Sequence, residues 1–400
     1  MSNLWKIIGK TLLTLAIVLV AVNITCSVRI HADNGETVRV SSSKELKAAM
    51  NNTAVGTIIF RTQKYMTLTI KNNKAAAEKF LIIDAPNASI TNKAVFAGIN
   101  IINANSYTER VSGNKISLSN VWIKDGFTVS KNMKVNSLEI YSNYFSSPFY
   151  TLRKGAKIKS VTLIYTGETA PIESTYDATK RQLTMEYTNP FGYEQKNEIT
   201  LDKRGQMINI KNLGDDLIEL ACDDIYTYDS NGNILSVTGL ADFGDVVKNV
   251  YTGNKLQKKE VWNGVNDYTY DDNRRLIHSE FHGEQDSDGI SYPINRIMDY
   301  KYDKKGRLLY EKYEDVESEY VVEISYTYNS KGFRTGYKEI ITSQERDYSD
   351  PDFKRYTSVT ESTFTYKYNK AGDLIMEKLV SGDDTKITKY KYDELGELIG

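Results

Sequence analysis

The stretch that decides the fold lies near the end of the chain and reads Tyr390-Lys-Tyr392-Asp393-Glu-Leu-Gly396-Glu-Leu398-Ile399. Its pattern recurs back to about residue 174, so more than half of the chain belongs to one repeated unit. Copies begin at residues 174, 199, 226, 249, 268, 300, 326, 366 and 390. The shorter separations, of 19 to 27 residues, predict a repeat architecture, and the longer ones contain insertions.

Each copy has the pattern of a β-hairpin. Tyr-x-Tyr places two rings on one face of a strand, because side chains alternate along a strand. Asp or Asn then opens a turn, and Gly three residues later closes it with a positive φ. Leu or Ile begins the returning strand. The turn residues predicted from this spacing include Asp229, Gly232, Asp303, Gly306, Gly332, Gly372, Asp393 and Gly396.

The hairpin pattern resembles the YD repeats of Rhs-type proteins over residues 174–400. The resemblance is carried by Tyr228-Asp229 with Gly232, Tyr302-Asp303 with Gly306, and Tyr392-Asp393 with Gly396. It implies a curled antiparallel β-sheet, since members of that family form β-sheet shells, some of which enclose a toxin or bind carbohydrate. The irregular insertions of this chain depart from the family pattern.

The region before the repeats has a different pattern. Ser42-x-x-Glu45 is a capping box and predicts a short helix through Met50. Short β-branched runs follow, such as residues 57–60 and 80–83, and Asn and Gly separate them. Short strands with Asn-rich corners predict a parallel β-solenoid whose open first coil is capped by the helix. A plain antiparallel sandwich is the alternative.

Residues 38–167 resemble the right-handed β-helices of the pectate-lyase-like superfamily. The cap helix, residues 56–60, and residues 81–87 with Ile90 carry this resemblance. The predicted fold is therefore all-β, with a short right-handed parallel β-helix, a linker at 168–173, and a sheet of hairpin repeats at 174–400. Because each half buries its own apolar strands, the two halves are expected to fold separately.

Residues 1–32 have the pattern of an export signal. Lys6 and Lys10 precede an apolar run from Leu12 to Val22, and cleavage is expected near Ala32. The run is shorter than the roughly 20 residues that span a bilayer, so we expect no membrane span in the mature chain. The prediction is a secreted protein or one on the cell surface, with an uncleaved anchor as the alternative.

Composition excludes some classes of partner. A net charge of -1 gives no electrostatic case for binding nucleic acid or an anionic membrane. Of the two cysteines, Cys26 is expected to leave with the signal, and Cys222 then has no partner for an internal disulfide.

The sequence offers no paired groups for catalysis. Acids of the solenoid region lie far apart in sequence, at Asp84, Glu109, Asp125 and Glu139. His278 and His282 flank Glu280 on a predicted strand, where they would be roughly 13 Å apart and too distant to share a metal ion. We therefore expect no catalytic residue, no metal and no cofactor.

The 29 tyrosines are the remaining candidates. At motif positions their phase favours a cross-strand ladder that stabilises the sheet. Tyr292, Tyr313 and Tyr348 lie in insertions and are predicted to be exposed ligand contacts. The sequence thus favours a secreted or surface scaffold, not an enzyme, that binds a glycan or a cell-surface protein. The alternative is a polysaccharide-acting β-helix enzyme of the lyase or glycosidase type.

Overall fold

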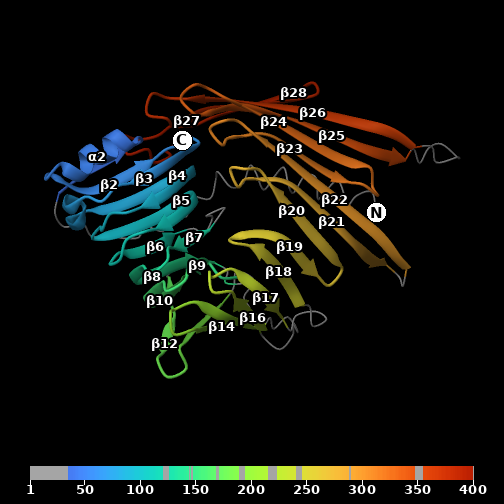
Figure 1. Cartoon of the computed structure of the whole chain (residues 1–400). Helices are drawn as coiled ribbons and strands as arrows, with labels where there is room; N and C mark the ends of the chain where they lie inside the picture. The colour runs from blue at the N-terminus through green and yellow to red at the C-terminus, as the bar shows by residue number, and fades with distance from the viewer. Residues whose placement is uncertain are drawn as a thin grey trace. The chain divides into compact units, whose positions relative to one another are not determined.

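The computed structural model describes residues 35–119, 126–143, 145, 147–167, 171–188, 194–214, 223–239, 246–287, 290–346 and 355–399. The predicted signal segment lies outside these ranges, as do Asp125, Cys222 and Tyr348. Within the ranges the fold is all-β, with sheets of 11 and 17 strands, one α-helix and one 3-10 helix. Figure 1 shows the order of these elements along the chain.

The first sheet consists of parallel strands, apart from the last one. Its strands are β1 (Glu36–Val40), β2 (Val55–Arg61), β3 (Met66–Ile70), β4 (Phe80–Asn92), β5 (Gly98–Glu109), β6 (Lys115–Ser119), β7 (Phe127–Val129), β8 (Lys134–Ser142), β9 (Tyr150–Leu152), β10 (Lys157–Tyr165) and β11 (Ile172–Glu173). The parallel pairing of β1 to β10 excludes the antiparallel sandwich. β11 pairs antiparallel with β10, so the end of the expected linker contributes a strand.

The parallel strands form coils whose side chains stack in register. One column runs through Ile58, Leu81, Ile99, Ile116, Leu138 and Val161, on β2, β4, β5, β6, β8 and β10. A second row of pairs joins β3, the end of β4, the end of β5, β7 and β9. The side chains of the first column are buried. The apolar runs in the sequence therefore become continuous internal columns.

The helix α2 (Ser43–Asn51) covers the first coil, as the capping box predicts. The side chain of Ser42 accepts a hydrogen bond from the Glu45 N–H at 3.3 Å, and Glu45 Oε2 accepts one from the Ser41 N–H at 2.8 Å. Leu46 and Met50 are buried in the same core as the coil strands. The 3-10 helix η1 (Lys74–Glu78) lies between β3 and β4.

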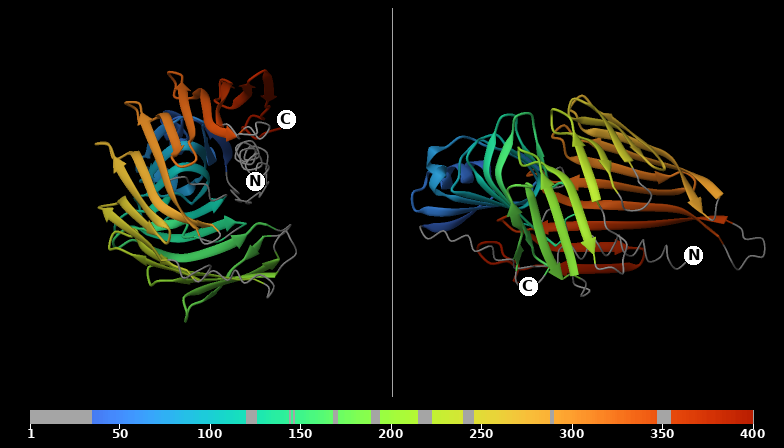
Figure 2. Two further views of the ribbon diagram at one scale, coloured as in Figure 1. Left: turned by 90° about the vertical axis from the view of Figure 1, so that its right-hand side faces the viewer. Right: turned by 90° about the horizontal axis from the view of Figure 1, so that it is seen from below.

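The second sheet is antiparallel, and its strands follow one another in chain order. They are β12 (Thr175–Asp177), β13 (Gln182–Thr188), β14 (Glu194–Leu201), β15 (Met207–Gly214), β16 (Asp223–Tyr228), β17 (Ile234–Thr238), β18 (Val246–Thr252), β19 (Lys255–Val261), β20 (Gly264–Tyr270), β21 (Leu276–Ser287), β22 (Ile290–Tyr302), β23 (Leu308–Asp315), β24 (Tyr320–Tyr328), β25 (Arg334–Arg346), β26 (Arg355–Tyr368), β27 (Leu374–Ser381) and β28 (Asp384–Lys389). Figure 2 shows the successive hairpins of this sheet from two further sides.

The hairpin turns share one backbone geometry. In the hairpin of β22 and β23, a β-bulge lies next to the turn, between Lys301 and Tyr302, and equivalent register shifts occur in six other hairpins. The glycines predicted to close the turns have the predicted sign of φ, with +81° at Gly232, +81° at Gly306, +91° at Gly332, +95° at Gly372 and +83° at Gly396. Glycine is favoured there because a left-handed backbone places a Cβ too close to the next carbonyl.

The turns at both ends of the second sheet contact the coils of the first. The Leu152 N–H donates to Gln206 Oε1 at 3.0 Å, and the Ile158 N–H donates to the Arg204 carbonyl at 2.8 Å. At the other end, the Tyr65 N–H donates to the Gly332 carbonyl at 3.0 Å. The first turns therefore contact the last coils, and a late turn contacts an early coil.

Ion pairs strengthen the contact between the last turns and the first coils. Arg39 of β1 pairs through its guanidinium with Asp373, and the two side chains are 10% and 6% exposed. Arg61 of β2 pairs with Asp84 at 2.8 Å and with Glu397 at 2.8 Å. One hydrophobic core also includes coil residues together with Leu183, Met185, Ile199, Leu201, Met207 and Ile210 of the first hairpins.

Candidate functional site

The Asp of each motif is a structural turn residue. Asp303 Oδ1 accepts hydrogen bonds from the N–H groups of Lys305 and Arg307, at 2.8 and 2.9 Å, and its Oδ2 pairs with the Arg307 guanidinium. Burial alone would raise the pKa of Asp303, but the hydrogen bonds from Arg307 lower it below its usual value. Asp229 accepts from Asn231 and Asn233 in the same way, and Asp393 accepts from Glu397.

The second Tyr of four motifs joins neighbouring hairpins. Tyr328 Oη donates to the Leu308 carbonyl at 2.8 Å, at the start of the returning strand of the preceding hairpin. Equivalent bonds run from Tyr228 to Met207, from Tyr270 to Leu256 and from Tyr368 to Arg334. These hydroxyls satisfy carbonyls near the bulges, so the motif tyrosines have a clear structural role.

An arginine four positions after the motif Asp connects two of the turns to the next turn along the sheet. Arg275 Nη1 donates to the Asp303 carbonyl at 2.9 Å, and its guanidinium lies 4.8 Å from the ring centre of Tyr302. Arg307 lies 4.7 Å from the ring centre of Tyr328 in the same arrangement. Each contact combines a charged hydrogen-bond donor with a cation–π interaction.

One face of the second sheet carries an aromatic cluster, and we name it the tyrosine face. It bears Tyr313, Tyr326, Tyr337 and Tyr366, because register and alternation place these side chains on the same side. Arg334 lies 5.1 to 5.7 Å from the ring centres of the last three. Burial raises the pKa of each of these three hydroxyls.

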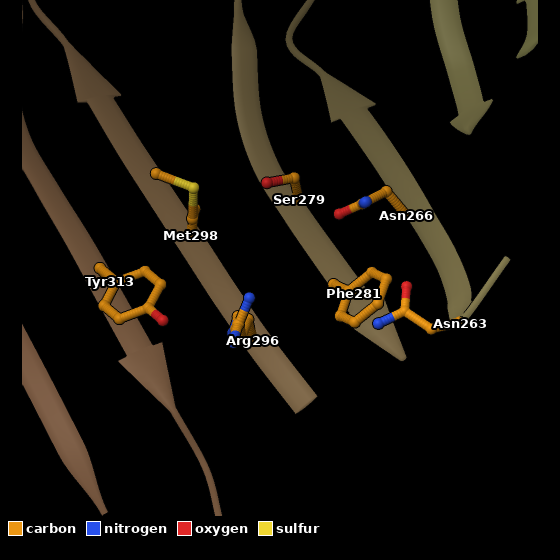
Figure 3. A pocket seen from close by; sticks show the side chains of 7 residues that line it. All are labelled: Asn263, Asn266, Ser279, Phe281, Arg296, Met298 and Tyr313. Carbon is orange, nitrogen blue, oxygen red and sulfur yellow. The ribbon is translucent and has the colours of Figure 1, made fainter. Parts of the chain in front are cut away.

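A hollow of about 300 Å³ opens on the tyrosine face where β20, β21, β22 and β23 lie side by side (Figure 3). Two cross-strand rows form it. Asn266 opposes Phe281, which opposes Arg296, and Ser279 opposes Met298, which opposes Tyr313. The residues that line the hollow are Asn263, Asn266, Ser279, Phe281, Arg296, Met298 and Tyr313.

The hollow combines apolar surface with polar groups. Phe281 is 9% exposed and Ser279 is 7% exposed, so both are largely covered by their neighbours. The Tyr313 ring packs edge-on against Tyr320, with ring centres 6.3 Å apart. Small-molecule sites in proteins typically pair an apolar lining with a few well-placed polar groups.

The three tyrosines predicted to contact a ligand lie in different places. Tyr313 lines the hollow. Tyr292 lies on β22 and is 49% exposed, but it does not line the hollow. Tyr348 lies outside the described residues. Sequence reasoning missed Asn263, Asn266 and Arg296, because only the register across β20, β21 and β22 brings them to one face.

The two histidines lie on the opposite face of the sheet. His278 Nδ1 is 2.7 Å from Asp299 Oδ1, and His282 Nδ1 is 2.7 Å from Asn295 Oδ1. His278 borders a second, wider hollow of about 650 Å³ with Asp299, Lys301 and Tyr310. No three His, Cys, Asp or Glu side chains of the described ranges are grouped so that they could hold a metal ion.

Acids of the coils are held by neighbouring side chains. Glu109 is fully buried, and its carboxyl accepts hydrogen bonds from Asn92, Asn114, Tyr107 and the Val111 N–H. Burial raises the pKa of Glu109 to about 7, although these hydrogen bonds oppose the shift.

The other described coil acids are also engaged. Asp84 pairs with Arg61 and accepts from Asn103 at 2.9 Å. Glu139 accepts from Ser117 and Tyr141, at 3.0 and 3.2 Å. None of these contacts places two of the three carboxyls together.

Comparisons with known proteins identify no family for this chain. No protein-family model matches the chain, and no curated protein matches it. A solved structure titled "Crystal Structure of TcdB2-TccC3-Cdc42" matches with a TM-score of 0.19 and 12% sequence identity. The match covers 58% of this chain and 17% of that one, so this chain spans only a small part of that protein's length. A TM-score of this size does not establish a shared fold.

In the described part of the chain, no helix is both long enough and apolar enough to cross a membrane.

Proposed function

We propose that this protein is an exported β-repeat scaffold that binds a glycan or another surface partner without catalysing a reaction. The observation that carries the proposal is the hollow on the tyrosine face. The ring of Tyr313 lines one side of it and the amides of Asn263 and Asn266 line the other, across β21 and β22. Aromatic rings offer an apolar surface to the faces of sugars, and amides match the donors and acceptors of sugar hydroxyls.

The architecture supports this proposal in a second way. Tyr hydroxyls and Arg side chains link the turns of the sheet and hold it rigid. The binding side chains are therefore already in place, and few of them need to become ordered when a ligand binds. We propose that the coils form a short right-handed β-helix of the pectate-lyase-like kind and that the hairpins are YD-type repeats. The parallel coils and the recurring Tyr-Asp turns support this finer description.

The alternative, a polysaccharide-acting β-helix enzyme, has less support. A glycosidase needs two carboxyls that face the substrate, and Glu109 is enclosed in the core. Asp84 is in turn paired with Arg61. We therefore favour binding over catalysis.

The proposal is tested by a glycan-array screen of the mature chain, followed by binding titrations with any glycan retained. Tyr313→Ala should weaken binding at least 10-fold. Tyr310→Ala is the matched control, because Tyr310 lies on the same strand but faces away from the hollow. The proposal fails if no glycan or surface protein binds, or if both variants bind as well as the parent.

Export is tested separately. If the signal is cleaved near Ala32, N-terminal sequencing of the secreted protein should begin near Asp33. A mature protein that still starts at Met1 would contradict cleavage and favour the anchor.

A further inference from the structure

The hollow has an uneven charge. Among the seven residues that line it there is one cation, Arg296, and no carboxylate. The Arg296 side chain is 47% exposed, so its guanidinium is accessible to solvent. The lining itself therefore contributes one positive charge, which the neighbouring Asp315 partly balances.

Arg296 forms one long ion pair, so its guanidinium can still donate hydrogen bonds to a second anion. Arg296 Nε lies 3.5 Å from Asp315 Oδ2, which is long for a charge-assisted hydrogen bond. The ion pairs within the turns are tighter, with 2.5 Å between Arg307 Nε and Asp303 Oδ2 for comparison. Arg296 is therefore only loosely engaged, unlike the arginines that link turns.

The neighbours of Arg296 favour a sugar over a simple anion. Arg296 opposes Phe281 across the strands, and Met298 on the same strand opposes Tyr313. The half-buried Tyr313 offers ring surface that an inorganic anion could not use. The amides of Asn263 and Asn266 border the same space and match hydroxyl groups. A volume of about 300 Å³ is at the small end of ligand sites and suits one or two sugar residues better than a long segment.

We propose that the hollow binds a sugar residue that carries a carboxylate, such as a uronic acid. The Arg296 guanidinium donates two parallel hydrogen bonds to the carboxylate, since its planar fork of N–H groups matches the planar geometry of that group. The Tyr313 ring packs on the face of this sugar, and Asn263 and Asn266, about 14 Å away across β21 and β22, bind hydroxyls of an adjoining sugar residue. This inference rests on the proposed glycan-binding function and specifies the class of ligand for the same site.

The experiment measures binding of two probes to the full mature chain and its variants. One probe is an oligosaccharide of glucuronic acid, and the other is the neutral glucose oligosaccharide of the same linkage and length. The parent should bind the acidic probe more tightly, and this preference should shrink as salt rises because a half-exposed ion pair is screened.

Three variants separate charge from packing. Arg296→Gln should weaken binding of the acidic probe about 10- to 100-fold and leave the neutral probe unchanged, since it removes a charge-assisted contact. Arg296→Lys should recover only part of this affinity, because an ammonium lacks the planar fork. Asp315→Asn removes the competing carboxylate and should tighten binding of the acidic probe.

The outcomes distinguish this inference from the proposed function. Equal affinity for both probes with loss of binding in Tyr313→Ala would keep the glycan site and overturn the acidic ligand. An acidic preference that survives Arg296→Gln, in a variant with an unchanged melting temperature, would also overturn it. Failure to bind any glycan would overturn the proposed function itself.

Discussion

The coils and the hairpin repeats are both built from β-strands, but they are stabilised in different ways. In the coils, aliphatic columns such as Ile58, Leu81 and Leu138 are almost completely buried. Among described residues 246–399, the nearly buried apolar side chains are Phe281, Ile294, Phe333, Phe364 and Tyr366. The coils thus depend on interior packing, while the repeats depend more on hydrogen bonds and ring contacts at their turns and between their strands.

This difference explains why the motif is repeated: its residues hold neighbouring hairpins together where little surface is buried. A single layer of strands buries little surface, so each hairpin needs other contacts to hold its neighbour. The Tyr hydroxyls of several motifs and the guanidinium groups of Arg275 and Arg307 supply these contacts, while the Asp carboxylate holds its own turn. If this difference holds, the stability of the coils should depend mainly on buried side chains, and that of the repeats on their motif residues. Where the two regions share a core, each should stabilise the other.

The largest effect is expected where the first hairpins share the core of the coils. A fragment of residues 33–214 should be more stable to denaturant than one of residues 33–169 by several kcal/mol. It retains buried side chains such as Leu183, Ile199 and Met207, and burying one such side chain contributes about 1.5–3 kcal/mol.

Circular dichroism during urea titration compares the two fragments. Equal stability would support two halves that fold separately, as the division of the sequence at 168–173 predicts. It would also mean that the shared core contributes little.

The second prediction compares two turn glycines with the same φ. Gly306→Val should destabilise the chain by about 1–2 kcal/mol, since a β-branched residue resists a left-handed backbone. Gly232→Val should destabilise the chain by about 1–3 kcal/mol more than Gly306→Val does, because a Cβ at Gly232 would lie 2.1 Å from the Leu152 carbonyl oxygen of the coils. By contrast, a Cβ at Gly306 meets only Arg275, at 3.9 Å.

Both variants are measured by chemical denaturation against the parent. An unchanged midpoint for Gly306→Val would contradict the hairpin register. Equal losses for the two variants would contradict the docking of the Gly232 turn on the coils.

The third prediction concerns the buried Glu109 of the coils. Its folded-state pKa of about 7 lies above the unfolded value near 4.5, so the folded chain keeps this proton over that interval. The free energy of unfolding should therefore fall by on the order of 3 kcal/mol as pH rises from 4.5 to 7.

Glu109→Gln should remove that part of the pH dependence, because glutamine does not titrate. Denaturation of both proteins at pH 5 and pH 8 is the measurement. If the variant and the parent show the same difference between the two pH values, Glu109 is not the titrating group.

The smallest effect is expected from a single hydroxyl of the repeats. Tyr328→Phe removes the hydrogen bond to the Leu308 carbonyl and should destabilise the chain by about 0.5–1.5 kcal/mol. Tyr292→Phe is the control, since the Tyr292 ring is half-exposed. This variant should change the free energy of unfolding by no more than about 0.5 kcal/mol. Thermal melts of both variants make the comparison, and equal melting temperatures would argue against a structural role for the motif hydroxyl.

Much of the local structure could be predicted from the sequence. The cap of α2 depends on Ser42 and Glu45, which are three residues apart. The turn at Gly306 depends on Asp303, also three residues away. Such contacts form within one turn of chain, so the residue types and their spacing are sufficient to predict them.

The candidate site could be predicted only in part. Tyr313 was identifiable as a tyrosine off the motif, but its partners in the hollow come from β20, β21 and β22 and from Asn263 before β20. A shift of one residue in any of these strand pairs would move those side chains to the other face. The register of four strands, and not the spacing in sequence, brings Asn266, Phe281 and Tyr313 to one hollow.

By itself, the sequence determined the hairpin, the positive φ of its glycines and the helix that caps the coils, because these depend on neighbours along the chain. Only the tertiary structure decided that Arg39 meets Asp373, that Arg61 meets Glu397 and that Glu109 is enclosed. The physical reason is distance along the chain. Contacts between residues more than 300 positions apart, such as the two ion pairs, depend on the summed curvature and register of the intervening strands, which no local pattern specifies.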